Sequence, residues 1–279
     1  MSYGVNIDSI KGKGYALIEP LILLNKRSIK KNLATKLEMD VFETIDSTST
    51  YLKAYFNSHQ LRICLAEQQT HGKGRLQREW HSPFGDNIYL SFLYPFQRDV
   101  SELAGLSLVV SLAMVETLKT FNLAKPILVK WPNDVMCGGK KLCGSLIELQ
   151  AETNGGCAAI IGIGMNVNML SDDTHAISQP WTSLRELFGD YIDRNLLCSM
   201  LINHLVDYLK QFEAQGFASF IDKWKEVDFL RGQDIQLMNV GQRIAGNVKG
   251  IDQNGHLLLK LQDGAVRTFS SGDTTVGKS

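Results

Sequence analysis

EQQTHGKGRLQREWHSPFGDNIYLS, residues 67–91, is the most informative stretch of the chain. Its first half sets Lys73, Arg75 and Arg78 around two glycines, and HGKGRLQR contains no acidic residue. Glycine lets the backbone approach a ligand closely, and the three cations can hold phosphate. Its end opens an apolar run at 87–96 that predicts a strand. The stretch therefore indicates an anion-binding loop beside a sheet, and a solvated surface loop is the alternative.

KWPNDVMCGGKKLCGSLIEL, residues 130–149, is the second informative stretch. Residues 131–134 predict a turn, because Pro cannot donate to a sheet ladder and Asn and Asp favour turns. Residues 137–139 predict a hairpin tip. Lys141 then opens an apolar strand, either as an edge residue that discourages aggregation or as a positioned cation. On this stretch alone, the edge residue is the simpler interpretation.

Two glycine-containing stretches resemble nucleotide motifs without fulfilling them. IGIGMNVNM, residues 161–169, lacks the third glycine of a dinucleotide fingerprint, and a strand whose glycine face admits a flat ligand fits better. GDTTVGKS, residues 272–279, formally matches a P-loop. A P-loop needs a helix after it, and Ser279 is the last residue of the sequence, so we interpret the match as chance.

Composition limits the function classes. The 279 residues are 44% hydrophobic and 21% charged, with 29 basic and 29 acidic residues, so an anion site must come from local clustering. Five cysteines without a CxxC pair favour reduced thiols in the cytoplasm. The histidines show no zinc spacing, so we expect no metal ligands. Neither a signal peptide nor a membrane span is expected.

Hydrophobic periodicity predicts an α+β protein. Helices are expected at 27–38, 47–58, 101–121, 194–213 and 215–227, with Ser101 as an N-cap. Strands are expected at 62–68, 87–96, 127–131, 141–150 and 158–169, and a loop at 171–182. From residue 231, turn pairs such as Asn254-Gly255 and Asp263-Gly264 predict a small all-β domain of about five strands. We expect a larger domain at 25–230 and an SH3-like domain at 231–279.

Together and in this order, the motifs resemble those of the biotin–protein ligases. The resemblance runs from about Ile45 to the C-terminus and includes IDST (45–48), the loop from Gln69 to Ser91, KWPND, KKLCGSLIEL and GIGMNVN. It implies a catalytic domain like that of class II aminoacyl-tRNA synthetases, followed by the SH3-like domain. It also implies that ATP with Mg²⁺ activates biotin to biotinyl-5′-AMP, and that the biotinyl group passes to a lysine of a carboxylase biotin carrier domain.

The resemblance assigns roles by position. Biotin contacts fall on Ser47, Thr48, Gln69, Gly72, Lys73, Lys141, Gly144, Leu146, Gly162 and Gly164. Adenylate contacts fall on Arg75, Arg78, Trp80, Asn133, Asn166 and Trp181. Lys141 and Arg75 would offset the repulsion between the biotin carboxylate and the α-phosphate. Asp134 would orient the attacking lysine of the carrier or accept its proton.

Two positions depart from the family pattern. Lys73 stands where arginine is usual, which keeps the charge but loses the bidentate fork. Leu76 stands where some relatives have a second arginine, which removes one phosphate contact.

YGVNIDSIKGKGYALIEP, residues 3–20, resembles the wing of a winged-helix domain. We interpret 1–24 as a remnant wing and linker, and we expect no sequence-specific DNA binding. The alternatives left open are a lipoate or octanoate ligase of the same fold, a biotin-responsive DNA-binding regulator if a helix-turn-helix lies upstream, and a carrier-binding scaffold. A homodimer linked to ligand binding is also left open.

Overall fold

A seven-stranded mixed sheet forms the centre of the molecule. The computed structural model describes residues 7–151, 156–170 and 177–277. Across the sheet the strands are β3 (Glu38–Ile45), β4 (Arg62–Gln69), β5 (Ile88–Phe96), β9 (Cys157–Met165), β8 (Lys140–Ala151), β7 (Asp134–Cys137) and β6 (Ile127–Lys130). The β3–β4 pair is parallel and the other neighbours are antiparallel. With its helices, this sheet confirms the predicted α+β class.

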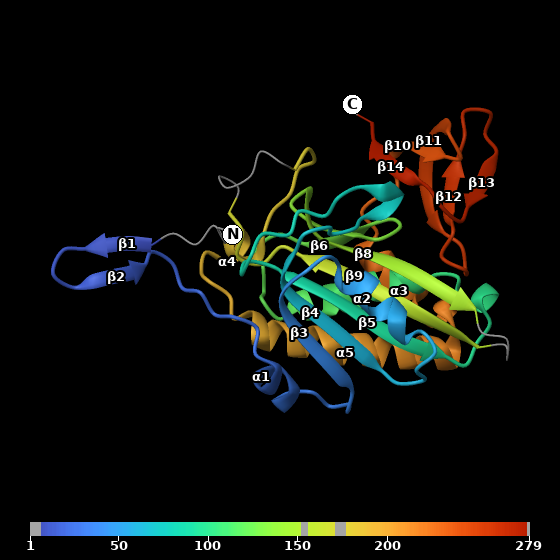
Figure 1. Ribbon diagram of the computed structural model, residues 1–279. Helices are drawn as coiled ribbons and strands as arrows, with labels where there is room; N and C mark the ends of the chain where they lie inside the picture. The colour runs from blue at the N-terminus through green and yellow to red at the C-terminus, as the bar shows by residue number, and fades with distance from the viewer. Residues whose placement is uncertain (1–6, 152–155, 171–176, 278–279) are drawn as a thin grey trace.

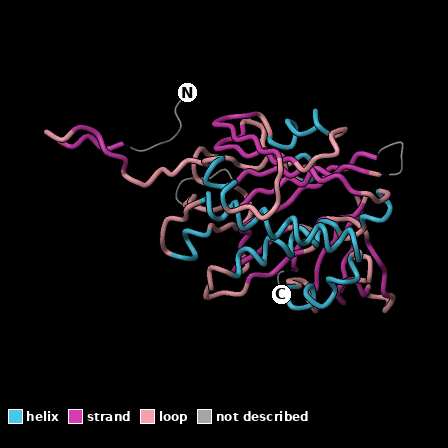
Figure 2. The backbone as a smooth tube through the Cα atoms, turned by 90° about the horizontal axis from the view of Figure 1, so that it is seen from below, coloured by secondary structure: helices cyan, strands magenta, loops and turns pink. Residues whose placement is uncertain are grey.

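Helices cover the two faces of this sheet unequally. The long helices α3 (Leu106–Lys119) and α5 (Arg194–Gln215) lie along one face, as Figures 1 and 2 show. Residues alternate between faces with period two. In β4, Ile63 and Leu65 join the main core with the long helices, whereas Cys64 packs in a second cluster with Leu52 of α2 (Thr48–Leu52). The second face is thus only partly covered by α2.

The C-terminal strands form a separate antiparallel sheet (Figure 1). Its order is β13 (Val266–Phe269), β12 (Leu257–Lys260), β11 (Gln242–Ile251), β10 (Asp234–Asn239) and β14 (Asp273–Val276). Gly255 and Gly264 have φ of +80° and +85°, where glycine meets no Cβ penalty, so the two predicted turn pairs form turns. Five strands agree with the SH3-like expectation. The boundary near 231 stays a prediction.

A two-stranded hairpin, β1 (Ile7–Ile10) and β2 (Gly14–Leu17), projects from the body (Figure 1). The chain after it is held by a buried ion pair between Arg194 and Glu67, whose N···O distance is 2.7 Å. Arg194 also donates to the Ile22 carbonyl at 2.9 Å, and Glu67 accepts from the Leu24 N–H. These bonds fix residues 22–24 against the seven-stranded sheet.

Several predicted elements differ from the structure. The helix expected at 27–38 is the shorter α1 (Lys26–Lys31). The helix expected at 101–121 starts at Leu106, because Gly105 has φ +84° and interrupts it. Asp99 rather than Ser101 is the capping residue there, at the start of a 3₁₀ turn at 100–103.

The helix expected at 215–227 is a 3₁₀ turn at 217–220 followed by α6 (Ile221–Val227). Strands β3 and β7 and the short helix α4 (Leu184–Phe188) were not predicted. Among the described residues, no helix has both the length and the hydropathy to cross a membrane.

Candidate active site

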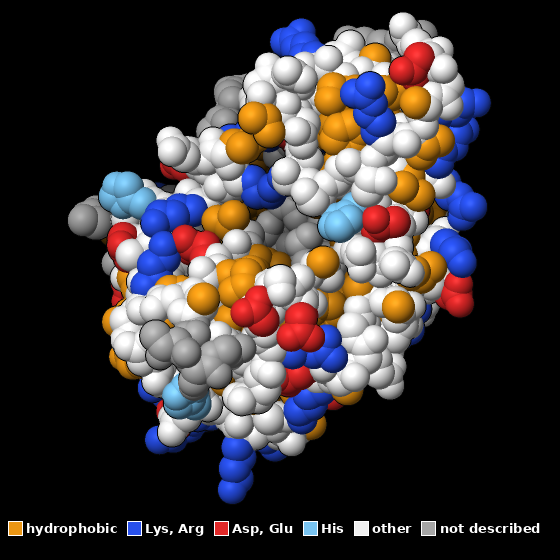
Figure 3. Space-filling view, turned by 90° about the vertical axis from the view of Figure 1, so that its right-hand side faces the viewer, with side chains coloured by type: hydrophobic (Ala, Val, Ile, Leu, Met, Phe, Trp, Pro, Cys, Tyr) orange, Lys and Arg blue, Asp and Glu red, His pale blue; other side chains and the backbone are white. Residues whose placement is uncertain are grey.

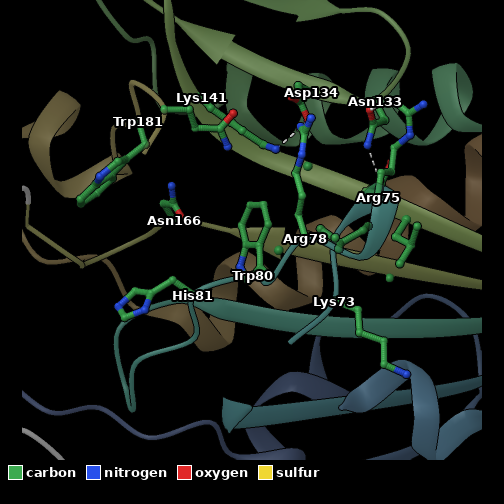
Figure 4. Close-up of a pocket in the computed structure, with 18 of the residues that line it drawn as sticks. Lys73, Arg75, Arg78, Trp80, His81, Asn133, Asp134, Lys141, Asn166 and Trp181 are labelled. Carbon is green, nitrogen blue, oxygen red and sulfur yellow. Dashed lines mark hydrogen bonds and ion pairs between the residues drawn. The ribbon is translucent and has the colours of Figure 1, made fainter. Parts of the chain in front are cut away.

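A cavity of about 950 Å³ opens over the sheet face that α2 leaves uncovered. It collects residues from the stretches at 45–48, 67–91, 130–149, 161–169 and 272–279, and Figure 4 shows those from the three middle stretches together with Trp181. The predicted site residues that line it are Ser47, Thr48, Gln69, Lys73, Arg75, Arg78, Trp80, Asn133, Asp134, Lys141, Gly144, Leu146, Gly162, Gly164, Asn166 and Trp181. Gly72 does not line it. Gly72 instead lies under the backbone of Trp80, where a Cβ would be 2.4 Å from the carbonyl oxygen.

The floor of the cavity is a stripe of small residues on three adjacent strands. Gly164 of β9 faces Gly144 of β8, and Gly162 faces Leu146 on β8 and Ser91 on β5. The Trp80 ring lies directly on Gly164, where a Cβ would come within 2.2 Å of the indole. The sequence predicted that this glycine face admits a flat ligand. In the structure the flat ring of Trp80 lies on it.

One end of the cavity is a network of neutral hydrogen-bonding groups. Gln69 accepts from the N–H and the hydroxyl of Thr48, at 2.9 and 3.0 Å, through Oε1. The Thr48 hydroxyl lies 2.8 Å from that of Ser91, and the Ser47 hydroxyl lies 3.0 Å from that of Ser49. An uncharged network of donors and acceptors suits a polar but neutral group such as a ureido ring.

The centre of the cavity is a lysine–carboxylate pair. Lys141 Nζ lies 2.8 Å from Asp134 Oδ1, and both side chains are largely buried. Lys141 Nζ also lies 5.1 Å from the centre of the Trp80 ring, within cation–π range. The backbone of Lys141 bonds to Pro180 and Thr182, which places Trp181 beside the same strand. The structure thus places Trp181, a predicted adenylate contact, beside Lys141, the predicted reacting cation.

Arg75 and Arg78 connect the basic loop to the C-terminal sheet. Arg75 donates to Asn133 Oδ1 at 3.1 Å and to the Gly272 carbonyl at 2.8 Å. Burial lowers the pKa of the Arg75 guanidinium, and the nearby carboxylates of Asp273 and Asp134 oppose that shift. Arg78 forms an ion pair with Asp273. Both arginines are held by oxygen acceptors that phosphate oxygens can replace.

The tip of the basic loop is strained. Leu76 and Gln77 have φ of +54° and +60°, a region that side-chain-bearing residues rarely adopt. Lys73 is held on the other side by its 2.8 Å hydrogen bond to the Thr50 hydroxyl. A residue with a positive φ, such as Leu76 or Gln77, lowers the stability of the fold by about 1–3 kcal/mol. Contacts with the surrounding residues therefore hold the loop in this conformation.

Three buried polar atoms around the cavity lack a hydrogen-bond partner in the described part of the chain. They are Trp80 Nε1, His81 Nε2 and Ser145 Oγ. Burial lowers the pKa of the His81 imidazole, which favours its neutral form. Unsatisfied buried groups are uncommon in native proteins, and ordered water is one ordinary partner for them.

Sequence reasoning missed three contributors to this site. Lys130 was quoted in KWPND but given no role, although it lines the cavity. Strand β14 lines it too, through residues 273–276. The stretch that matched a P-loop therefore lies beside the site. Its Gly272 carbonyl accepts from Arg75 and its Asp273 carboxylate pairs with Arg78, so it does not present N–H groups to phosphate as a P-loop does. Lys278 lies outside the described residues. His81 was passed over because a lone histidine carries little signal.

No resident metal site is evident in residues 7–151, 156–170 and 177–277, which hold no cluster of three or more His, Cys, Asp or Glu side chains suited to a metal ion. The two cavity carboxylates nearest the arginines and lysines, Asp134 and Asp273, are each already paired with a cation. This donor set does not fit a metal held by the protein alone.

Two family models match the chain. Residues 41–166 match the biotin/lipoate A/B protein ligase family, and residues 232–274 match the biotin protein ligase C-terminal domain. The Escherichia coli bifunctional ligase/repressor BirA is 36% identical over 275 residues, which cover 98% of this chain and 84% of that protein. The biotin–[acetyl-CoA-carboxylase] ligase of Paracoccus denitrificans is 30% identical over 70% of this chain and 82% of that protein.

The fold agrees with these matches. The structure of a biotin protein ligase from Aquifex aeolicus, solved with biotin and ATP, superimposes with a TM-score of 0.73 at 29% identity. The superposition covers 87% of this chain and 99% of that one. The architecture expected from the resemblance, a synthetase-like catalytic domain followed by a small β domain, is confirmed.

Proposed function

The chain belongs to the biotin protein ligases, and we propose that its cavity carries out both steps of their reaction. ATP activates biotin to biotinyl-5′-AMP, and the biotinyl group then passes to a carrier lysine. The observation that carries this proposal is one continuous cavity holding three kinds of environment. A neutral polar end surrounds Thr48 and Gln69, a cationic centre surrounds Lys141 and Arg75, and Trp181 stands beside that centre.

In the first step, a carboxylate oxygen of biotin attacks the α-phosphorus of ATP. The bond from that phosphorus to the bridging oxygen breaks, and pyrophosphate leaves with the electron pair. Two anions must meet for this to happen, and Lys141 offsets their repulsion from its place at the cavity centre. Arg75, aimed by Asn133, supplies the second cation. Mg²⁺ enters as the counter-ion of ATP.

In the second step, the neutral amine of the carrier lysine attacks the acyl carbon and AMP leaves. Asp134 is our candidate to orient that amine or accept its proton. It is paired with Lys141 in the structure, so it becomes available once Lys141 turns to the phosphate. The basic loop then shields the mixed anhydride from water. No covalent bond to the enzyme is needed.

The partner in this step is a biotin carrier domain of a carboxylase, by analogy with the naming of the Paracoccus relative. We propose a cytoplasmic location, which fits a sequence whose five cysteines include no CxxC pair. A homodimer linked to ligand binding stays a proposal that rests on the resemblance alone.

The test is incubation of the purified protein with Mg-ATP, a carrier domain and either labelled biotin or labelled lipoate. We expect acid-stable label from biotin on the carrier, and no label on a carrier whose acceptor lysine is changed to arginine. Label from lipoate with none from biotin would establish the alternative ligase. Absence of label from both acids, with a carrier that a known ligase can modify, would refute the proposal.

A further inference from the structure

Lys130 is a cation of the cavity that the reaction above leaves unused. It ends β6, and its partner across the β6–β7 ladder is Asp134. Directly opposed residues of antiparallel strands share a face of the sheet, so Lys130 points to the same side as Asp134 and lines the cavity. Within the described residues its ammonium group forms no ion pair or hydrogen bond, in contrast to Lys141, which holds Asp134 at 2.8 Å.

The surroundings of Lys130 are the end of the cavity where the two sheets meet. Its electrostatic neighbours are Asp134, Asp273, Lys141 and Arg78. Burial lowers the pKa of the Lys130 ammonium group, and the two carboxylates oppose that shift. A half-buried ammonium without a direct partner is an unfavourable arrangement unless an anion reaches it.

The charges of the cavity favour such an anion. Its described lining residues include five cations and three carboxylates: Lys73, Arg75, Arg78, Lys130 and Lys141 against Glu79, Asp134 and Asp273. Lys141 and Arg75 serve the biotin carboxylate and the α-phosphate. The remaining charge of ATP lies on its β- and γ-phosphates, and the remaining cations next to Asp273 are Lys130 and Arg78.

We propose that Lys130 binds the β- and γ-phosphates of ATP, and the pyrophosphate released from it, at the junction of β6 with strand β14. Arg78 joins it by exchanging its ion pair with Asp273 for a phosphate oxygen. As the bond to the α-phosphorus breaks, the leaving pyrophosphate gains a negative charge, and Lys130 stabilises that charge. This assignment rests on the proposed ligase reaction and concerns only its first step.

The two half-reactions separate this role from a structural one. Formation of the adenylate and its reversal involve pyrophosphate, whereas transfer from synthetic biotinyl-5′-AMP to the carrier does not. In Lys130→Met we expect inhibition by pyrophosphate to weaken about tenfold and the KM for ATP to rise similarly, as for one lost charge-assisted hydrogen bond. Lys130→Arg should stay within about threefold of wild type because it keeps the charge. Transfer from the synthetic adenylate should be unchanged in both variants.

Lys125→Met is the matched control, since Lys125 is exposed and lies against Gly138, outside the cavity. Calorimetric titration with magnesium pyrophosphate gives a readout that does not depend on turnover, and Lys130→Gln replaces Lys130→Met if that variant melts early. Unchanged pyrophosphate binding, or equal losses in both half-reactions, would overturn the proposal. Failure of the wild type to label a carrier from biotin would instead refute the ligase reaction, while the calorimetric comparison would still test Lys130.

Discussion

Asp134 lies between Lys141 and Lys130, and the two lysines differ in how they contact it. Lys141 is paired with it at 2.8 Å, whereas Lys130 opposes it across the strand ladder without direct contact. The Asp134 carboxylate opposes the lowering of the Lys130 pKa that burial causes. The pair also keeps Lys141 aimed at the cavity before substrate arrives, so little reorganisation is needed during the reaction.

Replacing Lys141 with alanine should abolish most adenylate formation. A positioned donor of this kind contributes about 3 kcal/mol in the transition state, which is about a hundredfold in rate. ATP–pyrophosphate exchange dependent on biotin measures the loss. The neighbouring Lys140 is exposed, so Lys140→Ala controls for the change in net charge. Exchange at the wild-type rate in Lys141→Ala would remove this lysine from the reaction.

His81 should make the stability of the protein sensitive to mild acid. Burial lowers the pKa of its imidazole below the value of about 6.5 expected in the unfolded chain. Below that value the unfolded chain binds more protons than the folded one, so the free energy of unfolding falls as pH decreases. Above about pH 6.5 both states are neutral at this residue and the effect vanishes.

The His81→Gln variant should therefore lose less melting temperature than wild type between about pH 7.5 and pH 5. Thermal melts over that range measure the difference, and His71→Gln, a change at an exposed histidine, is the control. Parallel curves for wild type and His81→Gln would contradict the assignment.

At the scale of elements, the sequence predicted the strands and turns whose own residues favour the conformation that they adopt in the fold. Strand β5 is a continuous apolar run, and the turns at Asn254-Gly255 and Asp263-Gly264 need only their own residues. Strand β3 was missed because its EMDVFETI mixes charges with apolar residues, and it forms only by pairing with β4. Strand β7 was missed because its first residue, Asp134, is the last residue of the predicted turn.

The basic loop is the element whose conformation the sequence did not predict. Its charge and glycines indicated an anion site, but its strained tip and its bonds to Asn133 and Gly272 depend on residues distant in the chain. No local signal connects Arg75 to a carbonyl 197 residues away. The contribution of β14 to the site could not be predicted for the same reason.

Replacing Arg75 with glycine should open this loop over the adenylate. Arg75 is the residue that ties the loop both to Asn133 and to the C-terminal sheet, so its loss removes two anchors. Activated biotin should then escape and label lysines of a bystander protein. Bystander labelling, normalised to the adenylate formed, is the measurement. Lys73→Ala, which removes only the contact with Thr50, should have a smaller effect. If bystander labelling stays at the wild-type level while adenylate still forms, the loop does not retain it.

At the scale of the whole molecule, the two sheets form one site. Trp131 donates through Nε1 to the Gly255 carbonyl at 3.0 Å, and its own carbonyl accepts from the Thr274 hydroxyl at 3.2 Å. These bonds connect the turn after β6 to the C-terminal sheet beside Lys130. The α+β class and the small all-β domain were predictable from the sequence pattern, but the contact between the two sheets was not, because it depends on single polar groups.

The described part of the chain should not bind DNA with sequence specificity. Specific readout needs an element in a groove that makes bidentate contacts to bases. Before α1, residues 7–25 contain only the hairpin β1–β2, whose basic residues are Lys11 and Lys13. On the face shown in Figure 3, basic side chains are interspersed with acidic and apolar ones. Contacts to a few phosphates give weak binding that depends strongly on salt.

A mobility-shift assay with DNA upstream of the organism's own biotin genes tests this expectation. Any complex should disappear between low salt and about 0.2 M salt, where contacts to several phosphates lose orders of magnitude in affinity. Replacing both Lys11 and Lys13 with alanine should weaken it equally on the specific and on a scrambled duplex, because phosphate contacts carry no sequence information. A complex that survives this salt concentration and an excess of scrambled competitor would instead show that the hairpin reads bases.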